Sequence, residues 1–394
     1  MPADLKSFIG RPVVEALASD VARVHPAFDR RAFVADALRG LEAKELLARG
    51  AHVSDALRRH LPADYEEAVG ILVRSLGPEL GGADLEGQGM APFRYLPHVA
   101  FVRDHGAAHF EASMRANHAL TRRFTAEWSI RPFLERYPQR TFALLAEWAS
   151  DPSVHVRRLV SEGTRPRLPW APQVRALRDD PRPGLALLER LRDDPELYVR
   201  RSVANHLNDV AKDHPELVVE TCGRWLEGAS PERRALVKHA LRSLVKRGDP
   251  GALALLGHGA RPRIEVVSAE VTPARVRIGG KAAFRVTLAS RARRSQSLAV
   301  DLEVHFVKKD GAARPKVMKG RALELRPGEI ATVAKTISLA VHSTRTPNPG
   351  AHAIDLLVNG VRYPGARFTV LPALAKAPPP PPRRGRALPS RRAR

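Results

Sequence analysis

The first part of the chain carries the apolar spacing of helices. Its apolar residues recur every three or four positions, as in Val13, Val14, Leu17 and Val21, and strand-like alternation is scarce. Residues at this spacing lie on one face of a helix, where they can pack against a neighbouring element. Residues 1–262 are therefore predicted to form an all-α domain.

Proline pairs divide this helical region. Asp-Pro pairs begin at Asp151 and Asp194, and a His-Pro pair begins at His214. These positions suit helix starts, because a proline there costs no backbone hydrogen bond. A glycine-rich stretch, residues 80–89, predicts a loop inside the domain.

Two stretches of the helical region repeat. The segment from Ala143 to Val160 recurs 43 residues later without a gap, and each copy holds an Asp-Pro turn and a pair of arginines. A fainter third copy lies at residues 230–234. A period near 40 with helix, turn and helix is typical of HEAT-like repeats, which stack into a curved solenoid with a concave binding face. The paired arginines predict that this face is basic.

The apolar pattern changes to period two after Pro262. Apolar residues at every second position from Leu298 to Phe306 alternate with more polar ones, and residues 330–341 form a second β-prone run. Turn signals such as Asn359-Gly360 fall between such runs. Six or seven short strands in about 110 residues predict an immunoglobulin-like β-sandwich over residues 263–371.

The last segment, residues 372–394, holds five consecutive prolines and then an arginine-rich run. Such a composition cannot bury a core, so we expect a disordered basic tail. The predicted fold class is therefore multi-domain: an all-α HEAT-like solenoid, an all-β sandwich and this tail.

Positive charge concentrates toward the C-terminus. The net charge of +23 divides into +5 over residues 1–262, +11 over 263–374 and +7 over 375–394. Lysine and arginine side chains that neutralise phosphates release counterions, so this distribution favours a nucleic-acid partner. A solubility device or an arginine-rich genome is the alternative explanation of the charge.

Several classes of chemistry lack support. A single cysteine, Cys222, excludes a disulfide framework and a cysteine-based zinc site, and it fits a reducing compartment. The 15 histidines show no metal-ligand spacing, and no glycine-rich phosphate loop follows a strand. No window offers the roughly 18 apolar residues of a membrane span. We expect a cytoplasmic protein without metal, cofactor or membrane contact.

Acidic residues accompany the arginines of the two repeats. Arg201, Asn205 and Asp209 are spaced four apart on one predicted helix, and the 43-residue offset maps Glu162 onto Asn205. Equivalent positions of a solenoid face the same surface, so Glu162 and Asp209 are expected near one basic surface, with Arg158 and Arg201 beside them. Ordinary ion pairs at helix spacing are the alternative, although a carboxylate that faces DNA repels phosphate.

Carboxylates in such a place have a chemical use. They can attract a positively charged base or stabilise an oxocarbenium-like sugar while a glycosidic bond breaks. Glu127 offers a third carboxylate, unless it is merely an exposed helical residue. Trp170 follows a proline-rich stretch and could either stack on a base or cap the core. Trp148 and Trp225 lie in apolar stripes and are predicted to be core residues.

The run from Arg157 to Trp170, the segment from Ser202 to Pro215 and the pair Glu127-Trp128 resemble the AlkC group of bacterial DNA alkylation repair glycosylases, which is related to the AlkD type. The resemblance covers most of the chain and is strongest over residues 120–230. An immunoglobulin-like C-terminal domain also occurs in an AlkC subgroup.

The resemblance implies hydrolysis of the N-glycosidic bond of cationic N3-alkylated bases in duplex DNA. The first candidate base is 3-methyladenine and the second is 3-methylcytosine. It also implies a solenoid that bends the DNA rather than flipping a base deep into a pocket. We expect a monomer in the bacterial cytoplasm, associated with the nucleoid while it acts.

The resemblance assigns the site by position. Glu127, Glu162 and Asp209 would form the acidic active-site cluster, and Trp170 would contact the lesion. The expected DNA-binding residues are Arg157, Arg158, Arg165, Arg167, Arg200, Arg201, Asn205, His206 and Lys212. A non-catalytic HEAT-like protein that binds damaged or branched DNA is the alternative, and a protein-interaction scaffold is disfavoured by the charge.

Overall fold

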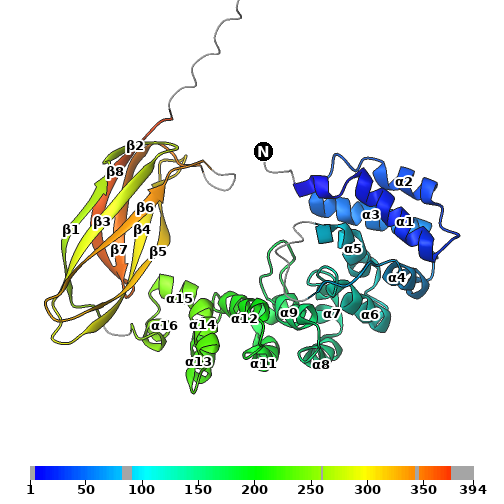
Figure 1. Ribbon diagram of the computed structural model, residues 1–394, viewed down its shortest axis with the longest axis horizontal. Coiled ribbons are helices and arrows are strands. Elements are labelled where there is room, and N and C mark those ends of the chain that lie inside the picture. The colour runs from blue at the N-terminus through cyan, green and yellow to red at the C-terminus, as the bar shows by residue number, and fades with distance from the viewer. Residues whose placement is uncertain (1–4, 82–90, 259–260, 342–345, 374–394) are drawn as a thin grey trace, which may run out of the picture. The chain divides into compact units, whose positions relative to one another are not determined.

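Helices build the first part of the chain and strands the second, as the change of hydrophobic period predicts (Figure 1). The computed structural model describes residues 5–81, 91–258, 261–341 and 346–373. Two compact units divide the chain, Met1–Val245 and Lys246–Arg394. The boundary expected at 262 lies between the last helix and the first strand. The predicted tail, apart from its first two residues, and most of the predicted glycine-rich loop lie outside the described residues.

Within the described residues, sixteen α-helices and two 3₁₀ helices precede the strands. The 3₁₀ helices are η1 (Leu5–Phe8) and η2 (Ala91–Tyr95). The α-helices are α1 (Arg11–Val24), α2 (Arg30–Leu38), α3 (Leu46–His60), α4 (Tyr65–Arg74), α5 (Leu96–His105), α6 (Phe110–Thr121), α7 (Arg131–Arg136), α8 (Pro138–Trp148), α9 (Val154–Gly163), α10 (Arg175–Asp179), α11 (Arg182–Leu191), α12 (Leu197–Val210), α13 (Pro215–Leu226), α14 (Pro231–Ala240), α15 (Arg242–Arg247) and α16 (Pro250–Leu255).

The 43-residue repeat corresponds to two stacked helix pairs, α8–α9 and α11–α12. Helix α12 packs between α9 and α14 in one layer, while α8 and α11 contact each other in the other layer (Figure 1). The apolar stripe of α12 is fully buried between these helices, from Val199 through Val203 and Leu207 to Val210. This confirms the HEAT-like architecture, and it places α9 and α12 side by side.

The predicted proline punctuation falls at helix starts. Helix α13 begins at Pro215, and α9 and α12 each begin two residues after an Asp-Pro proline. In both repeats the aspartate carboxylate accepts a hydrogen bond from the backbone N–H two residues later. The Ser153 N–H donates to Asp151 at 2.7 Å, and the Glu196 N–H donates to Asp194 at 2.9 Å. The turn chemistry is therefore repeated together with the helices.

Eight strands follow in the described residues, one more than the upper predicted number. They are β1 (Ile264–Thr272), β2 (Arg275–Arg277), β3 (Lys281–Ser290), β4 (Gln296–Val307), β5 (Ala313–Leu325), β6 (Ile330–Ser338), β7 (Gly350–Val358) and β8 (Val361–Leu371). One sheet has the order β1-β3-β6 and the other β2-β8-β7-β4-β5, and every pair is antiparallel except β2 with β8.

The predicted alternation of β4 holds in the sandwich core. The apolar positions from Leu298 to Phe306 are buried, and they meet inward residues of the other strands such as Phe284 and Ile354. Trp148 and Trp225 are buried in the helical unit, as predicted, and Cys222 is buried there as well. Among the described residues, we find no helix that is both long enough and apolar enough to cross a bilayer.

The two-residue turn between β7 and β8 shows the predicted Asn-Gly chemistry. Asn359 and Gly360 have φ angles of 46° and 76°, the left-handed region that a type I′ hairpin turn requires. The Asn359 side chain accepts the Ala299 N–H at 2.7 Å and donates to the Ser297 carbonyl at 3.1 Å. The turn is thereby attached to strand β4.

We expect Asn359→Ala to lower the free energy of unfolding by about 2 kcal/mol, because it loses both hydrogen bonds and the tolerance for positive φ. Asn359→Gly should lose less, since glycine adopts this φ without strain. Thermal unfolding of both variants checks the order, and equal losses would show that the side-chain bonds alone matter.

Candidate active site

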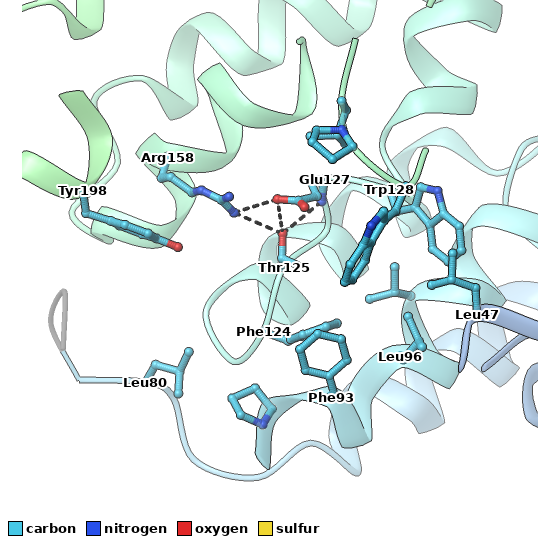
Figure 2. Close-up of a pocket in the computed structure, with 15 residues that line it drawn as sticks. Leu47, Leu80, Phe93, Leu96, Phe124, Thr125, Glu127, Trp128, Arg158 and Tyr198 are labelled. Carbon is cyan, nitrogen blue, oxygen red and sulfur yellow. Dashed lines mark hydrogen bonds and ion pairs between the residues drawn. The ribbon is translucent and has the colours of Figure 1, made fainter. Parts of the chain in front are cut away.

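A hollow of about 280 Å³ opens in the helical unit, between the segment after α6 and the loop after α9 (Figure 2). Its walls are mainly aliphatic and aromatic, with Phe93, Phe124 and Trp128 on one side and Tyr198 on the other. Thr125, Glu127 and Arg158 supply polar groups to the lining. A concave apolar site with a few convergent polar groups is the usual form of a binding pocket.

Acidic and arginine side chains alternate from the wall of this hollow into the repeats. Arg158 Nη1 lies 2.7 Å from Glu127 Oε2, and Arg158 Nη2 lies 3.5 Å from Glu162 Oε1. Arg165 then donates from Nη1 to Glu162 at 2.5 Å and from Nε to Asp209 at 2.8 Å. We call Glu127, Arg158, Glu162, Arg165 and Asp209 the acid–arginine row.

The inner end of the row is buried. Glu162 and Asp209 are only 6% and 3% exposed, so they do not emerge at a surface as the sequence pattern led us to expect. Ser202 donates to Glu162 at 2.6 Å, and Lys212 donates to Asp209 at 2.9 Å. Helices α9 and α12 are thus joined by charges as well as by apolar packing.

The guanidinium groups keep Glu162 ionised. Burial by itself would raise the pKa of this carboxyl group, but the charges of Arg158 and Arg165 and the bond from Ser202 outweigh burial. The pKa of Glu162 is therefore lowered below its ordinary value. A carboxylate in this state can stabilise positive charge but holds no proton to donate near neutral pH.

Glu127 is the member of the acidic cluster that lines the hollow together with Trp170. Trp170 is 66% exposed and has a φ of 64°, so it does not cap the core. Across the hollow, the Arg158 guanidinium lies over the Tyr198 ring, 5.3 Å from its centroid. The hollow therefore brings one carboxylate, one exposed indole and one stacked guanidinium together.

Arg157 and Arg200, predicted to bind DNA, instead hold the repeat turns. Each donates from Nη1 to the carbonyl oxygens five and six residues earlier, at 3.2 and 2.9 Å for Arg157 and at 2.7 and 2.6 Å for Arg200. Arg157 also forms a bidentate pair with Asp194 of the next repeat. The arginine pairs recur because the turns recur, so these two residues have a structural role that the sequence analysis did not predict.

The prediction that His206 binds DNA does not fit the structure, because the residue is only 1% exposed. Its Nδ1 donates to the Ser161 carbonyl at 2.9 Å, and burial lowers the pKa of the ring to about 4. A neutral ring inside the repeat interface has no access to phosphate. His206 therefore fixes the packing of α9 on α12.

The remaining predicted contacts have different surroundings. Arg167 pairs bidentately with Asp213 at 2.9 and 2.6 Å, and Asn205 accepts a hydrogen bond from Arg242 at 2.9 Å. Arg201 is exposed and lines a second hollow, between α12 and α14, so it does not stand beside Asp209 as expected. Arg165 occupies that place instead.

The sequence pattern missed two residues of the site. Tyr198 was passed over although it directly precedes the apolar stripe of α12, and Arg131 was passed over although it stands alone in the apolar run Ile130–Leu134. Arg131 is buried and donates to backbone carbonyls of the loop that carries Trp170. An isolated arginine in an apolar run is the signal that could have pointed to it.

A group with possible metal ligands lies away from this site, on β4 and β7. Among the described residues, Glu303, His305 and Asp355 place their ligand atoms within 4.8 Å of one another. Arg362 Nη2 lies 2.6 Å from Glu303, and His305 lies 3.0 Å from Asp355. Both carboxylates thus already have partners, Arg362 for Glu303 and His305 for Asp355, so the group is a polar network of the sheet.

Comparisons with known proteins agree with this architecture. The family described as "Uncharacterised protein YhaZ, C-terminal Ig-like domain" matches residues 265–372. The uncharacterized protein YhaZ of Bacillus subtilis (strain 168) is 35% identical over 360 residues, which cover 91% of this chain and 97% of that protein.

A solved structure extends the similarity to nearly the whole fold. The alkylpurine DNA glycosylase AlkC of Pseudomonas fluorescens, bound to DNA containing an abasic site analog, is 35% identical and covers 93% of this chain and 99% of its own, with a TM-score of 0.85. By this similarity, the helical repeats and the immunoglobulin-like unit are those of a DNA glycosylase of the helical-repeat class. The chain belongs to the AlkC family of DNA glycosylases.

Neighbouring arginines on α12 allow the turn assignment to be tested. We expect Arg200→Ala to lower the free energy of unfolding by about 1–2 kcal/mol, because two carbonyl oxygens lose a charged donor. Arg201→Ala should change it by less than about 0.5 kcal/mol, since this side chain is exposed. Urea unfolding measures both, and the reverse order would contradict the structural assignment of Arg200.

Proposed function

We propose that the protein binds duplex DNA and excises cationic N3-alkylated bases by hydrolysing the N-glycosidic bond. 3-Methyladenine is the first proposed substrate and 3-methylcytosine the second. The AlkC relative bound to DNA with an abasic site analog supports both the partner and the type of product. The observation that carries the proposal is the acid–arginine row, which ends at Glu127 in the wall of an aromatic hollow.

The charge of the row suits a cationic substrate. The three carboxylates of the row are balanced by its two guanidinium groups and by Lys212, which pairs with Asp209 at the end remote from Glu127. At the hollow, the row therefore offers only the local field of the Glu127 carboxylate, where a positive base or sugar would lie. A neutral base gains less from this field, which gives selectivity for the alkylated form.

The reaction needs little help at the leaving group. A base alkylated at N3 is already positive, so it departs as a neutral molecule with the electron pair of the glycosidic bond. Positive charge then develops on the sugar, and water adds to the anomeric carbon and loses a proton. We assign Glu127 to stabilise the sugar and to align this water, because it is the carboxylate in the wall of the hollow.

The buried acids, Glu162 and Asp209, act indirectly, through the arginines that they hold. Glu162 and Asp209 fix the two arginines of the row, and through Arg158 they set the position of Glu127. Because these charges are arranged before substrate arrives, they need no reorganisation during the reaction. Trp170 offers an exposed ring at the same hollow, suited to stacking on the damaged base or the adjoining sugar.

We expect Glu127→Gln, Glu162→Gln and Asp209→Asn each to lower the single-turnover excision rate of 3-methyladenine by about 100-fold or more. Affinity for undamaged duplex should change by less than about threefold, because these carboxylates do not hold phosphate. Asp193→Asn is the matched control: it removes an acid that pairs bidentately with Arg233 at 2.6 Å and does not line the hollow, and it should leave the rate nearly unchanged.

The measurements are base release from methylated oligonucleotides and binding by fluorescence anisotropy. Parallel losses of binding and excision in the three variants would reject the assigned roles. A wild-type protein that binds DNA but releases no alkylated base would support the non-catalytic alternative.

The pH dependence follows from the lowered pKa of Glu162. A carboxylate whose pKa falls on folding contributes stability above its ordinary pKa of 4.5, and this contribution is lost as pH falls through the lower, folded value. The excision rate should therefore stay level from pH 8 down to about 5. A rate that falls on acidification with a midpoint near pH 6 in the wild type, but not in Glu162→Gln, would contradict this expectation. It would show that Glu162 takes up a proton near pH 6 and that this lowers the rate.

A further inference from the structure

The loop between α9 and α10 carries two residues of the site on little backbone support of its own. Arg165 stands near its beginning and Trp170 near its end. The backbone bonds within it run from the Arg165 N–H to Glu162 at 3.2 Å and from the Ala171 N–H to Leu168 at 3.5 Å. Such sparse bonding cannot by itself fix the course of the loop, so its shape depends on side chains around it.

One buried guanidinium joins both ends of this loop. Arg131, the first residue of α7, is 4% exposed and donates from Nη1 to the carbonyl oxygens of Gly163 at 3.1 Å and Arg165 at 2.9 Å. Its Nε and Nη2 donate to the carbonyl oxygen of Pro172 at 2.9 and 2.7 Å. Burial lowers the pKa of Arg131 to about 10, so the group stays charged at neutral pH.

The conformation of Trp170 needs such support. A φ of 64° is sparsely populated for a bulky residue, and it persists only where the surroundings hold it. Buried Leu168 anchors the middle of the loop, while the indole of Trp170 remains exposed beside the hollow. The carbonyls that Arg131 binds lie on both sides of this residue, and one of them belongs to Arg165 of the acid–arginine row.

We propose that Arg131 is a positioning residue for base excision: it fixes the loop so that Trp170 stands at the hollow and Arg165 stays between Glu162 and Asp209. This rests on the proposed function, because positioning has value only if the hollow receives the damaged nucleotide. Arg131 touches no substrate in this account and acts through the loop. Lysine is a poor replacement, because its donors sit on a single nitrogen, whereas Arg131 uses three nitrogens to bind carbonyl oxygens at both ends of the loop.

The chain offers a matched control in Arg49. This arginine is also buried, at 7% exposed, and like Arg131 it donates four hydrogen bonds to backbone carbonyls, here those of Lys6, Ile9, Glu42 and Lys44 at 2.8–3.0 Å. It binds the segments around η1 and before α3 rather than the loop after α9. Arg131→Lys and Arg49→Lys should therefore lower the melting temperature by similar amounts, while their local effects differ.

The first experiment measures hydrogen–deuterium exchange of the full-length variants. Arg131→Lys should speed exchange of amides in residues 164–173, whereas Arg49→Lys should leave that segment at the wild-type rate. Unchanged exchange of this loop in Arg131→Lys would overturn the proposal. This readout does not depend on activity, so it remains decisive if the protein turns out not to release alkylated bases.

The second experiment tests whether the effect passes through Trp170. Arg131→Lys should lower the single-turnover excision rate by about 100-fold, and Arg49→Lys by less than about threefold. In a Trp170→Ala background, Arg131→Lys should cost much less than it does alone, because both changes remove the same interaction. Two outcomes would contradict the positioning role and leave Arg131 only a role in overall stability. One is that the rate losses of the two substitutions multiply in the double variant; the other is that Arg49→Lys lowers the rate as much as Arg131→Lys.

Discussion

Three carboxylates can lie inside this repeat structure because guanidinium groups stand between them. A buried carboxylate without a partner is costly, and removing one partner of a buried pair leaves the other uncompensated. Glu162 comes from α9, Arg165 from the loop after it and Asp209 from α12, so the ion pairs also fix how one repeat lies on the next. The packing of α9 on α12 and the charge at the hollow therefore depend on the same contacts.

This dependence explains how a rigid fold can serve a reaction that develops charge. The apolar stripe of α12 and the buried His206 fix the packing of α9 on α12, and these helices carry most side chains of the acid–arginine row. Glu127, at the outer end, lies in the wall of the hollow, where it is bonded by Thr125 and Arg158 rather than left to move in solvent. A fixed carboxylate stabilises developing positive charge without reorganising, whereas a mobile one must first be ordered.

The sequence predicted the repeat and the sandwich, because helix spacing and strand alternation report which positions share a face. The 43-residue offset related Glu162 to the helix of Asp209, and the two do bind one common side chain. It could not identify that side chain as Arg165, because helical periodicity says nothing of where a loop returns. The predicted number of strands was low for a similar reason: a strand such as β2, with three residues, carries no alternation to detect.

In this chain, the arginine content is a poor guide to the DNA-binding surface, because several arginines bind groups of the protein itself. Arg200 holds a turn, Arg165 neutralises buried acids and Arg131 supports a loop, and none of these duties is visible in a net charge of +23. Each uses the several donors of the guanidinium group to satisfy groups on the protein itself. Arginines so engaged release few counterions from DNA, so attraction to phosphate must come from the exposed cations that remain. In the repeats, arginine holds both the turns and the buried acids, whereas most of the excess charge lies in residues 263–394.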